Sequence, residues 1–240
     1  MSTYAVKFHH REEVAEGTMA FHFEKPAGFD FKAGQAIDVI LPDPPTGDAQ
    51  SSRHTFSIVT APFEVDLAIA TRMRDSVFKR TLKSLPIGAT LKIEGFFGSL
   101  TLHRDLARPA VFIAGGIGIT PFVSMLRQAT KDGAYRQLTL LYSNRRPQDA
   151  AFLAELQELQ RQNENFRLIA TMTALSESDG PWNGETGLID ARLIGRVVED
   201  VSGATYYVAG PPGMVDTMRR TLAQAGVSDD GVRSEEFYGY

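Results

Sequence analysis

The sequence contains no cysteine among its 240 residues. This excludes disulfide bonds, thiolate nucleophiles, thiolate zinc sites and a cysteine-held iron–sulfur cluster from the chain. A surplus of positive charge is also missing, because 25 lysines and arginines stand against 29 aspartates and glutamates. Nucleic acid is therefore not the expected partner, since contacts to phosphates need a basic surface.

Long apolar runs are missing as well. No run reaches the roughly 18 residues that a membrane helix needs, and the first residues resemble the start of a strand instead of a basic, apolar signal peptide. We therefore expect a cytoplasmic protein without membrane insertion. Neither a Gly-x-Ser-x-Gly motif nor a Walker-type Gly-Lys-Ser/Thr loop occurs, which disfavours an α/β-hydrolase and a nucleoside triphosphatase.

The first part of the chain has the residue pattern of a β-domain. Short runs typical of strands, separated by glycine and proline, lie at 18–24, 36–41, 54–59, 65–71 and 90–94. Runs at this spacing predict an antiparallel barrel or sandwich. One segment, Ser76 to Leu85, carries Phe78, Leu82 and Leu85 at helical spacing. We predict an N-terminal antiparallel β-barrel over residues 1–105, capped by this one helix.

The pattern of apolar and polar residues changes after Arg108. Residues 109–114 form a continuous apolar run, which is typical of a strand buried on both faces of a parallel sheet. Further strands are expected at 137–142, 166–172 and 205–209, and helices at 121–130, 149–162, 191–196 and 213–225. Strands that alternate with helices predict a doubly wound parallel α/β domain over residues 106–240. The predicted fold is thus a two-domain β + α/β protein.

A glycine-rich turn follows the first strand of this second half. Its sequence is Gly115-Gly116-Ile117-Gly118-Ile119-Thr120-Pro121, and a predicted helix comes next. Glycines allow a pyrophosphate to approach the backbone closely, and the helix N-terminus offers free N–H groups. Pro121 stands where the standard dinucleotide fingerprint has a third glycine. The turn predicts nucleotide binding, and a purely structural turn is the alternative.

The next predicted strand runs into the segment Ser143-Asn144-Arg145-Arg146. In a dinucleotide-binding fold this tip faces the adenosine ribose, where an acidic residue selects NAD and a basic residue suits the 2′-phosphate of NADP. No acidic residue occupies the tip. The pattern favours NADPH, and the alternative is a solvated arginine pair in a loop.

Five segments carry a family pattern in a fixed order along nearly the whole chain. They are Ala33-Gly34-Gln35, Arg53-His54-Thr55-Phe56-Ser57, the turn 114–121, the loop 207–214 (Tyr-Val-Ala-Gly-Pro-Pro-Gly-Met) and the terminal segment 235–240 (Glu-Glu-Phe-Tyr-Gly-Tyr). Together they resemble the ferredoxin–NADP reductase superfamily, in which an FAD-binding barrel precedes a pyridine-nucleotide domain. The resemblance implies a reductase that takes a hydride from NAD(P)H onto bound FAD. Its electrons would pass to a separate acceptor, either a small redox protein such as ferredoxin or flavodoxin or a diffusible molecule.

The resemblance also implies which residues hold the flavin. Phe56 would lie against the isoalloxazine ring, and Ser57 would hydrogen-bond near its reactive N5 atom. Arg53 or His54 would contact the pyrophosphate, because the arginine stands one position earlier than in the family pattern. The other implied flavin-binding residues are Thr55, Arg72 and Ser76.

The implied nicotinamide site uses both loops of the second half. Thr120 would lie near the nicotinamide, and Phe237 or Tyr240 would stack on the flavin until the nicotinamide displaces it. The residues implied to bind the nucleotide are Gly115, Gly116, Gly118, Thr120, Pro121, Ser143, Asn144, Arg145, Ala209, Gly210 and Pro211. Ser57, Phe237 and Tyr240 are the residues implied to act in the hydride step.

The five histidines all lie in the first half of the chain. None shares a helix with a second ligand at metal spacing, so we expect surface or barrel-lining histidines and no metal site. The segment from His9 to Glu13 is interpreted as a polar strand end and turn.

Two other functions stay open. One is a reductase of free flavins or ferric chelates, which weak retention of FAD and activity with added FMN would favour. The other is a non-enzymatic FAD-binding, redox-sensing subunit of a larger complex, which a lack of turnover with NADH or NADPH would favour.

Overall fold

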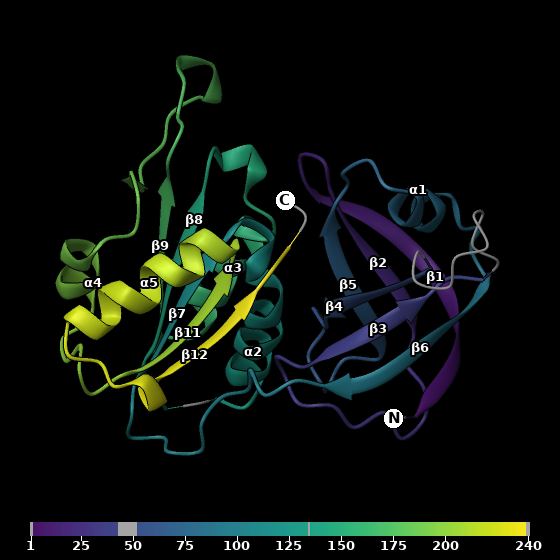
Figure 1. Cartoon of the computed structure of the whole chain (residues 1–240), viewed down its shortest axis with the longest axis horizontal. Coiled ribbons are helices and arrows are strands. Elements are labelled where there is room, and N and C mark those ends of the chain that lie inside the picture. Colours follow the sequence, from purple (N-terminus) through teal and green to yellow (C-terminus); the bar gives the residue numbers. More distant parts are fainter. Residues whose placement is uncertain (1, 43–51, 134, 239–240) are drawn as a thin grey trace.

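The structure is a computed structural model that describes residues 2–42, 52–133 and 135–238. It holds two six-stranded sheets, one from each half of the chain, which stand side by side (Figure 1). The strand pairs of the first sheet are antiparallel, and those of the second are parallel. The predicted β + α/β architecture is confirmed.

The first sheet has the strand order β4–β3–β6–β1–β2–β5. Its members are β1 (Thr3–Ala15), β2 (Thr18–Glu24), β3 (Ala36–Ile40), β4 (Arg53–Ser57), β5 (Asp66–Arg72) and β6 (Thr90–Phe97). The two edge strands meet through a bridge between Ile58 and Ile69, and the Val59 amide donates to the carbonyl of Ala68 over 2.8 Å. These contacts close the sheet into a barrel.

Helix α1 (Val77–Ser84) covers the interior of this barrel. Its buried side chains Phe78 and Leu82 belong to the same core cluster as Phe21 and Phe23 of β2. Alternation along β2 points the two phenylalanines to one side of the strand, and each fully buried ring contributes about 1.5–3 kcal/mol to folding. The predicted capping helix is confirmed.

The second sheet has the strand order β10–β9–β8–β7–β11–β12. Its members are β7 (Ala110–Gly115), β8 (Leu138–Asn144), β9 (Phe166–Met172), β10 (Glu185–Thr186), β11 (Thr205–Gly210) and β12 (Val232–Glu236). The helices are α2 (Thr120–Lys131), α3 (Leu153–Gln162), α4 (Ala191–Val197) and α5 (Pro212–Gln224). Phe112 packs with α2 and α3 on one face, whereas Val111 packs with α4 and α5 on the other. The sheet is therefore doubly wound.

Two local predictions were wrong, and the sequence analysis also omitted a strand. Strand β1 continues through residues 9–13, which were interpreted as a strand end and turn, and the chain reverses only after Ala15. Helix α3 begins at Leu153 instead of Asp149, because a 3-10 turn (Pro147–Asp149) and Phe152, with φ at 61°, precede it. Edge strand β12 was not predicted, since its Val-Arg-Ser-Glu-Glu sequence has one apolar residue and no alternation.

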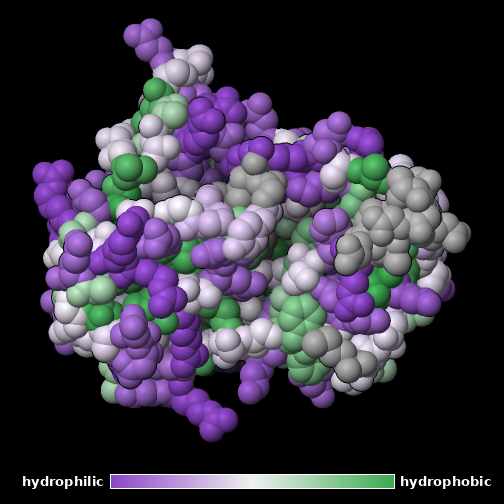
Figure 2. All heavy atoms as spheres, in the orientation of Figure 1, coloured by the Kyte–Doolittle hydropathy of each residue, from purple (hydrophilic) through white to green (hydrophobic). Residues whose placement is uncertain are grey.

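No helix in the described part of the chain is long and apolar enough to cross a membrane. On the face shown in Figure 2, hydrophilic side chains predominate and hydrophobic ones form small groups. The apolar residues are instead gathered in the core clusters of the barrel and of the two faces of the second sheet.

Candidate active site

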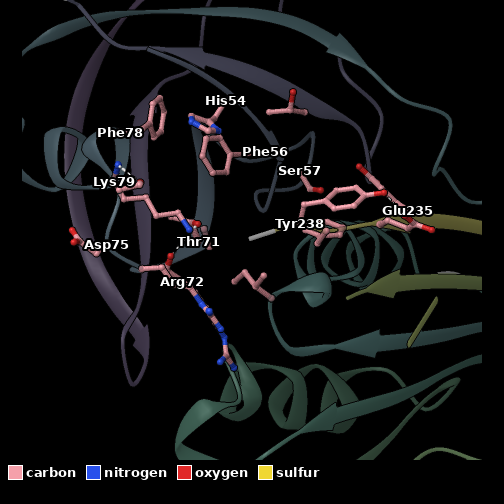
Figure 3. A pocket seen from close by; sticks show the side chains of 17 residues that line it. His54, Phe56, Ser57, Thr71, Arg72, Asp75, Phe78, Lys79, Glu235 and Tyr238 are labelled. Carbon is pink, nitrogen blue, oxygen red and sulfur yellow. Dashed lines mark hydrogen bonds between the residues drawn. The ribbon is translucent and has the colours of Figure 1, made fainter. Parts of the chain in front are cut away.

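A cavity of about 660 Å³ opens at the seam between the barrel and the second sheet. Strands β4 and β5 and helix α1 supply one wall, and Ile117 and residues 235–238 supply the other. Figure 3 shows His54 and Phe56 on the barrel side, with Glu235 and Tyr238 on the opposite side. The volume lies in the range of cofactor-binding cavities.

Aromatic rings form part of the barrel wall. His54 and Phe56 project from the same face of β4, because side chains alternate along a strand. Both contact Phe78 of α1, with ring centroids 4.4 Å from His54 and 5.8 Å from Phe56. Burial, together with the charge of Lys79, lowers the pKa of His54 and favours its neutral imidazole. This apolar, aromatic wall suits a planar ring system.

Ser57 ends β4 at the wall of the cavity and is 3% exposed. Its Oγ has no hydrogen-bond partner in the described part of the chain. A buried hydroxyl without a partner costs about 1–3 kcal/mol. The hydroxyl is therefore placed to bond a polar atom of a molecule in the cavity, and a ring nitrogen of a flavin fits this need.

Three cations line the same cavity: Arg72, Arg74 and Lys79. Ser76 precedes α1, and its Oγ accepts a hydrogen bond from the Lys79 amide over 3.2 Å. Burial lowers the pKa of Lys79, and the charge of Arg74 lowers it further. Arg72 extends towards the second half of the molecule (Figure 3), where it donates to the carbonyl of Asp149 over 3.4 Å. Cations beside a helix N-terminus suit a pyrophosphate.

Arg53 lies outside the lining of this cavity. Its Nε donates to the Asp38 carboxylate over 2.8 Å, and its Nη2 lies 2.6 Å from the Glu94 carboxylate. Thr55, which does line the cavity, also donates its hydroxyl to Asp38. Asp38 is almost fully buried and needs these partners. Of the two residues that the sequence left open for a phosphate contact, His54 is the one at the cavity.

Strand β12 brings the end of the chain to the cavity. Burial raises the pKa of the Glu235 carboxyl, which lines the wall. The Phe237 amide donates to the carbonyl of Gly210 over 2.9 Å, which fixes Phe237 at the rim. Tyr238 also lines the cavity and is 79% exposed. Tyr240, the other aromatic residue predicted to stack on the flavin, lies outside the described residues.

A second cavity of about 500 Å³ lies at the carboxyl ends of the parallel strands, where such sheets bind ligands. It is lined by residues of the glycine turn, of the tip of β8, and of the start of α5 with the residue before it: Gly115, Gly116, Ser143, Asn144, Arg145, Pro211 and Met214. Arg72 and Arg74 line both cavities. The two cavities therefore adjoin along these arginines.

The glycine turn divides its residues between the cavity and the interior. Gly115 and Gly116 line the second cavity, and Gly116 has a φ of 53°, which favours glycine. A Cβ on Gly118 would stand only 2.4 Å from the carbonyl oxygen of Ala209. Gly118 therefore lets the turn pack against β11, and its contribution is to packing.

Four other residues predicted for the nucleotide site lie behind the surface of the cavities. Thr120 and Pro121 are buried at the start of α2, and the Thr120 hydroxyl donates to the carbonyl of Ile117 over 3.0 Å. Ala209 and Gly210 are buried at the end of β11. None of the four appears in the lining of either cavity described above, so they support the loops that do.

The two arginines at the tip of β8 have different surroundings. Arg145 lines the second cavity. Arg146 instead pairs with Asp149 at 2.8 Å and with Glu16 of the barrel at 3.1 Å. The Arg146 guanidinium holds the pKa of Asp149 below its usual value. Arg145 is therefore the arginine of the pair that a nucleotide in the cavity would meet.

Arg74, Phe78, Lys79 and Glu235 are among the residues of the first cavity that sequence analysis missed. Phe78 was predicted only as an apolar residue of the capping helix, and it also joins the barrel core. Lys79 could have been predicted as a cavity residue from its position in the first turn of the capping helix. Glu235 belongs to the terminal segment that carried the family pattern, but its burial depends on the unpredicted strand β12.

Comparisons with known sequences agree with this geometry. Residues 112–220 match the family model described as "Oxidoreductase NAD-binding domain". The chain is 30% identical over 227 residues to ferredoxin–NADP reductase B of Sorangium cellulosum, covering 90% of this chain and 89% of that protein. It is 31% identical over 220 residues to the reductase component of propane 2-monooxygenase from Rhodococcus jostii, covering 89% of this chain and 57% of that protein. The chain thus spans less than two thirds of that reductase component.

Solved structures share the fold. A ferredoxin NADP+ reductase from Neisseria gonorrhoeae with bound FAD and NADP superposes with a TM-score of 0.82 at 19% identity, covering 98% of both chains. The FAD/NAD-binding domain of nitric oxide dioxygenase from Vibrio cholerae superposes with a TM-score of 0.83 at 19% identity, covering 97% of this chain and 98% of that one.

Proposed function

This chain belongs to the ferredoxin–NADP reductase superfamily, and from that membership we propose that it is an FAD-dependent oxidoreductase. Bound FAD would accept a hydride from NAD(P)H and release the electrons to a separate acceptor. The observation that carries the proposal is the buried hydroxyl of Ser57 on the wall of the seam cavity, which has no hydrogen-bond partner among the described residues.

The first cavity would hold the FAD. Phe56 and His54 would contact its planar ring, and Ser57 would hydrogen-bond a heteroatom of that ring. Ser76 and the first N–H groups of α1 would bind the pyrophosphate, with Arg74 as its counter-charge. Arg53 is not among the residues proposed to bind FAD, because its guanidinium is paired with Asp38 and Glu94.

The second cavity would hold the nicotinamide nucleotide. The shared lining by Arg72 and Arg74 supports this assignment, because hydride transfer requires that the nucleotide lie next to the flavin. Gly115 and Gly116 leave room for the pyrophosphate. We assign residues 1–105 to FAD binding and residues 106–240 to nucleotide binding.

NADPH is the proposed hydride donor. The 2′-phosphate of NADPH needs a cation that is not already paired, and a guanidinium binds phosphate well. Arg145 lines the nucleotide cavity, whereas Arg146 is neutralised by Asp149 and Glu16. Arg145 would therefore select NADPH over NADH.

The acceptor would be a separate small redox protein, such as a ferredoxin or flavodoxin, or a diffusible molecule. The chain has no cysteine with which to hold an iron–sulfur relay. Two relatives point in the same direction, since one is a ferredoxin–NADP reductase and the other is the reductase component of a monooxygenase.

Anaerobic stopped-flow mixing of the purified protein with NADPH and with NADH tests the proposal. We expect a yellow protein whose flavin absorbance is lost on mixing, faster with NADPH. A colourless protein that takes up no added FAD would contradict the proposal. Turnover only with added free FMN would instead indicate a reductase of free flavins, and FAD binding without reduction by either nucleotide would indicate a redox-sensing subunit.

A further inference from the structure

Two histidines and a glutamate meet on the outer face of the barrel. His10 of β1 lies directly opposite His22 of β2 in the antiparallel register. Glu12 is two residues along β1 from His10, so it projects from the same face of the strand. A register shift between Phe8 and His10 leaves His9 as the extra residue of a bulge. The bulge sets which histidine of the His9–His10 pair faces His22.

The side chains of this triad are close together. The imidazole rings of His10 and His22 stack with centroids 4.0 Å apart and planes 12° apart. The Nε2 atom of His22 is 3.2 Å from a carboxylate oxygen of Glu12. One ligand atom from each of the three residues lies within 4.8 Å of the other two.

We propose that His10, Glu12 and His22 form a binding site for a divalent transition metal, of which Zn²⁺ is the simplest representative. Two imidazole nitrogens and one carboxylate oxygen are the ligands that Zn²⁺, Ni²⁺ and Cu²⁺ accept readily. Zinc–ligand bonds of about 2.0–2.2 Å in a tetrahedron place ligand atoms roughly 3.3 Å apart. The pair His22 and Glu12 already has this spacing.

The lone pairs of the two stacked imidazoles lie in nearly parallel planes, so side chains of the triad must rotate before all three ligand atoms face one ion. The Glu12 side chain is 57% exposed and His10 is also exposed, so both can rotate around a metal ion held by the less exposed His22. Three protein ligands leave one position of a tetrahedral ion for water. The site is therefore a surface metal site that links β1 to β2.

The site is separate from the redox cavities. None of its three residues lines either cavity described above, and the proposal does not depend on the proposed function. His9 provides a matched control, because it stands next to His10 in the bulge but its Nδ1 atom pairs with Asp66, 3.1 Å away. It is not a member of the triad.

Isothermal titration of the full chain with zinc chloride, after removal of any affinity tag, tests the proposal. We expect one Zn²⁺ per chain, with binding weakened by about tenfold or more in His22→Ala, because each ligand forms a direct bond to the metal. Glu12→Gln should also weaken binding, and His9→Ala should leave it unchanged. Chelation of the metal should lower the thermal midpoint of zinc-loaded wild type but not that of His22→Ala, because the ion binds the native barrel.

Two results would overturn the inference. One is wild-type affinity for Zn²⁺ in both His22→Ala and Glu12→Gln; the other is no saturable binding by the wild type. Circular dichroism without metal shows whether each variant folds. Glu12→Gln is the decisive variant if His22→Ala unfolds, since an exposed side chain is changed there to one of equal size.

Discussion

Arg127 of α2 donates to the carboxylate of Glu64 in the barrel across the seam, with 3.3 Å between Nη1 and Oε2. The same guanidinium donates from Nε to Glu155 of α3 over 2.5 Å, and Nη1 lies 3.4 Å from the carbonyl oxygen of Val59. One largely buried cation thus ties the barrel to two helices of the second layer.

We expect Arg127→Ala to lower the free energy of unfolding by about 2–4 kcal/mol, because it leaves two partly buried carboxylates without their cation. Chemical denaturation measures this change. Arg161→Ala is the matched control, because it removes an exposed pair with Glu158 on α3 and should change stability little. Similar free energies of unfolding for the two variants would contradict the claim that the Arg127 contacts across the seam stabilise the fold.

Gly118→Ala should destabilise the protein by about 1–3 kcal/mol, since a Cβ would stand 2.4 Å from the Ala209 carbonyl oxygen and force the turn away from β11. Gly213→Ala on α5 is its control. A Cβ at Gly213 meets no atom within 4 Å, so this change should be neutral or slightly stabilising. Differential scanning calorimetry compares the two, and a midpoint for Gly118→Ala at or above that of Gly213→Ala would show that the turn tolerates the methyl group.

Ser57→Ala should slow reduction of bound flavin by NADPH about 10- to 100-fold, which corresponds to the loss of one hydrogen bond to a group that gains charge. The FAD-free protein should not lose stability, because the hydroxyl has no partner there in the described chain. Ser84→Ala on the exposed side of α1 should alter neither property. A wild-type reduction rate in Ser57→Ala would remove this residue from the hydride step.

The contribution of Glu235 to the free energy of unfolding depends on pH. Burial raises its pKa above the ordinary value of 4.5, so between that value and the raised native pKa the folded state holds a proton that the unfolded state has lost. The contribution of this group is complete below the unfolded pKa and falls as pH rises through the native pKa.

Glu235→Gln removes this titration. The free energy of unfolding of the variant, relative to the wild type, should therefore be higher at about pH 8 than at about pH 4. Urea denaturation at the two pH values measures the difference. Glu164→Gln, which changes an exposed glutamate, should show no such trend, and a flat difference for Glu235→Gln would mean that Glu235 is solvated.

Arg145→Gln should raise the KM for NADPH by about tenfold and leave that for NADH within about twofold, because a glutamine lacks the charge that would pair with the 2′-phosphate. Steady-state kinetics with both nucleotides measures this. Arg146→Gln serves as the comparison, since its guanidinium is paired with Asp149 and its loss should affect both nucleotides alike. Equal effects of Arg145→Gln on the two nucleotides would place coenzyme selection elsewhere.

Much of the fold could be predicted because its elements have a regular period. Strands β2 and β9 have the bounds that alternation and apolar runs predicted, and helix α1 is amphipathic from its capping serine onward. Strand β12 escaped prediction because an edge strand with little buried surface needs no apolar pattern. The late start of α3 depends on Phe152, whose left-handed conformation no local sequence signal indicates.

Site residues could be predicted where the position of a residue on its own strand makes it face the cavity. They could not be predicted where the direction of a side chain depends on contacts with residues far away in the sequence. Ser57 and Phe56 follow from the position of β4. The Arg53 guanidinium is instead held by Asp38 and Glu94, which lie on two other strands. The metal triad depends in the same way on the register that sets His10 against His22, a pairing that the separation of the two residues in sequence does not reveal.

The double role of Arg72 and Arg74, which border both cavities, has a thermodynamic consequence. A dinucleotide bound in one cavity would neutralise part of the positive charge that attracts an anionic ligand to the other. If the two cavities hold the proposed flavin and nicotinamide nucleotide, each ligand should weaken the binding of the other, and by linkage the two factors are equal. This antagonism would favour dissociation of the oxidised nucleotide from the flavin-loaded protein without a conformational change.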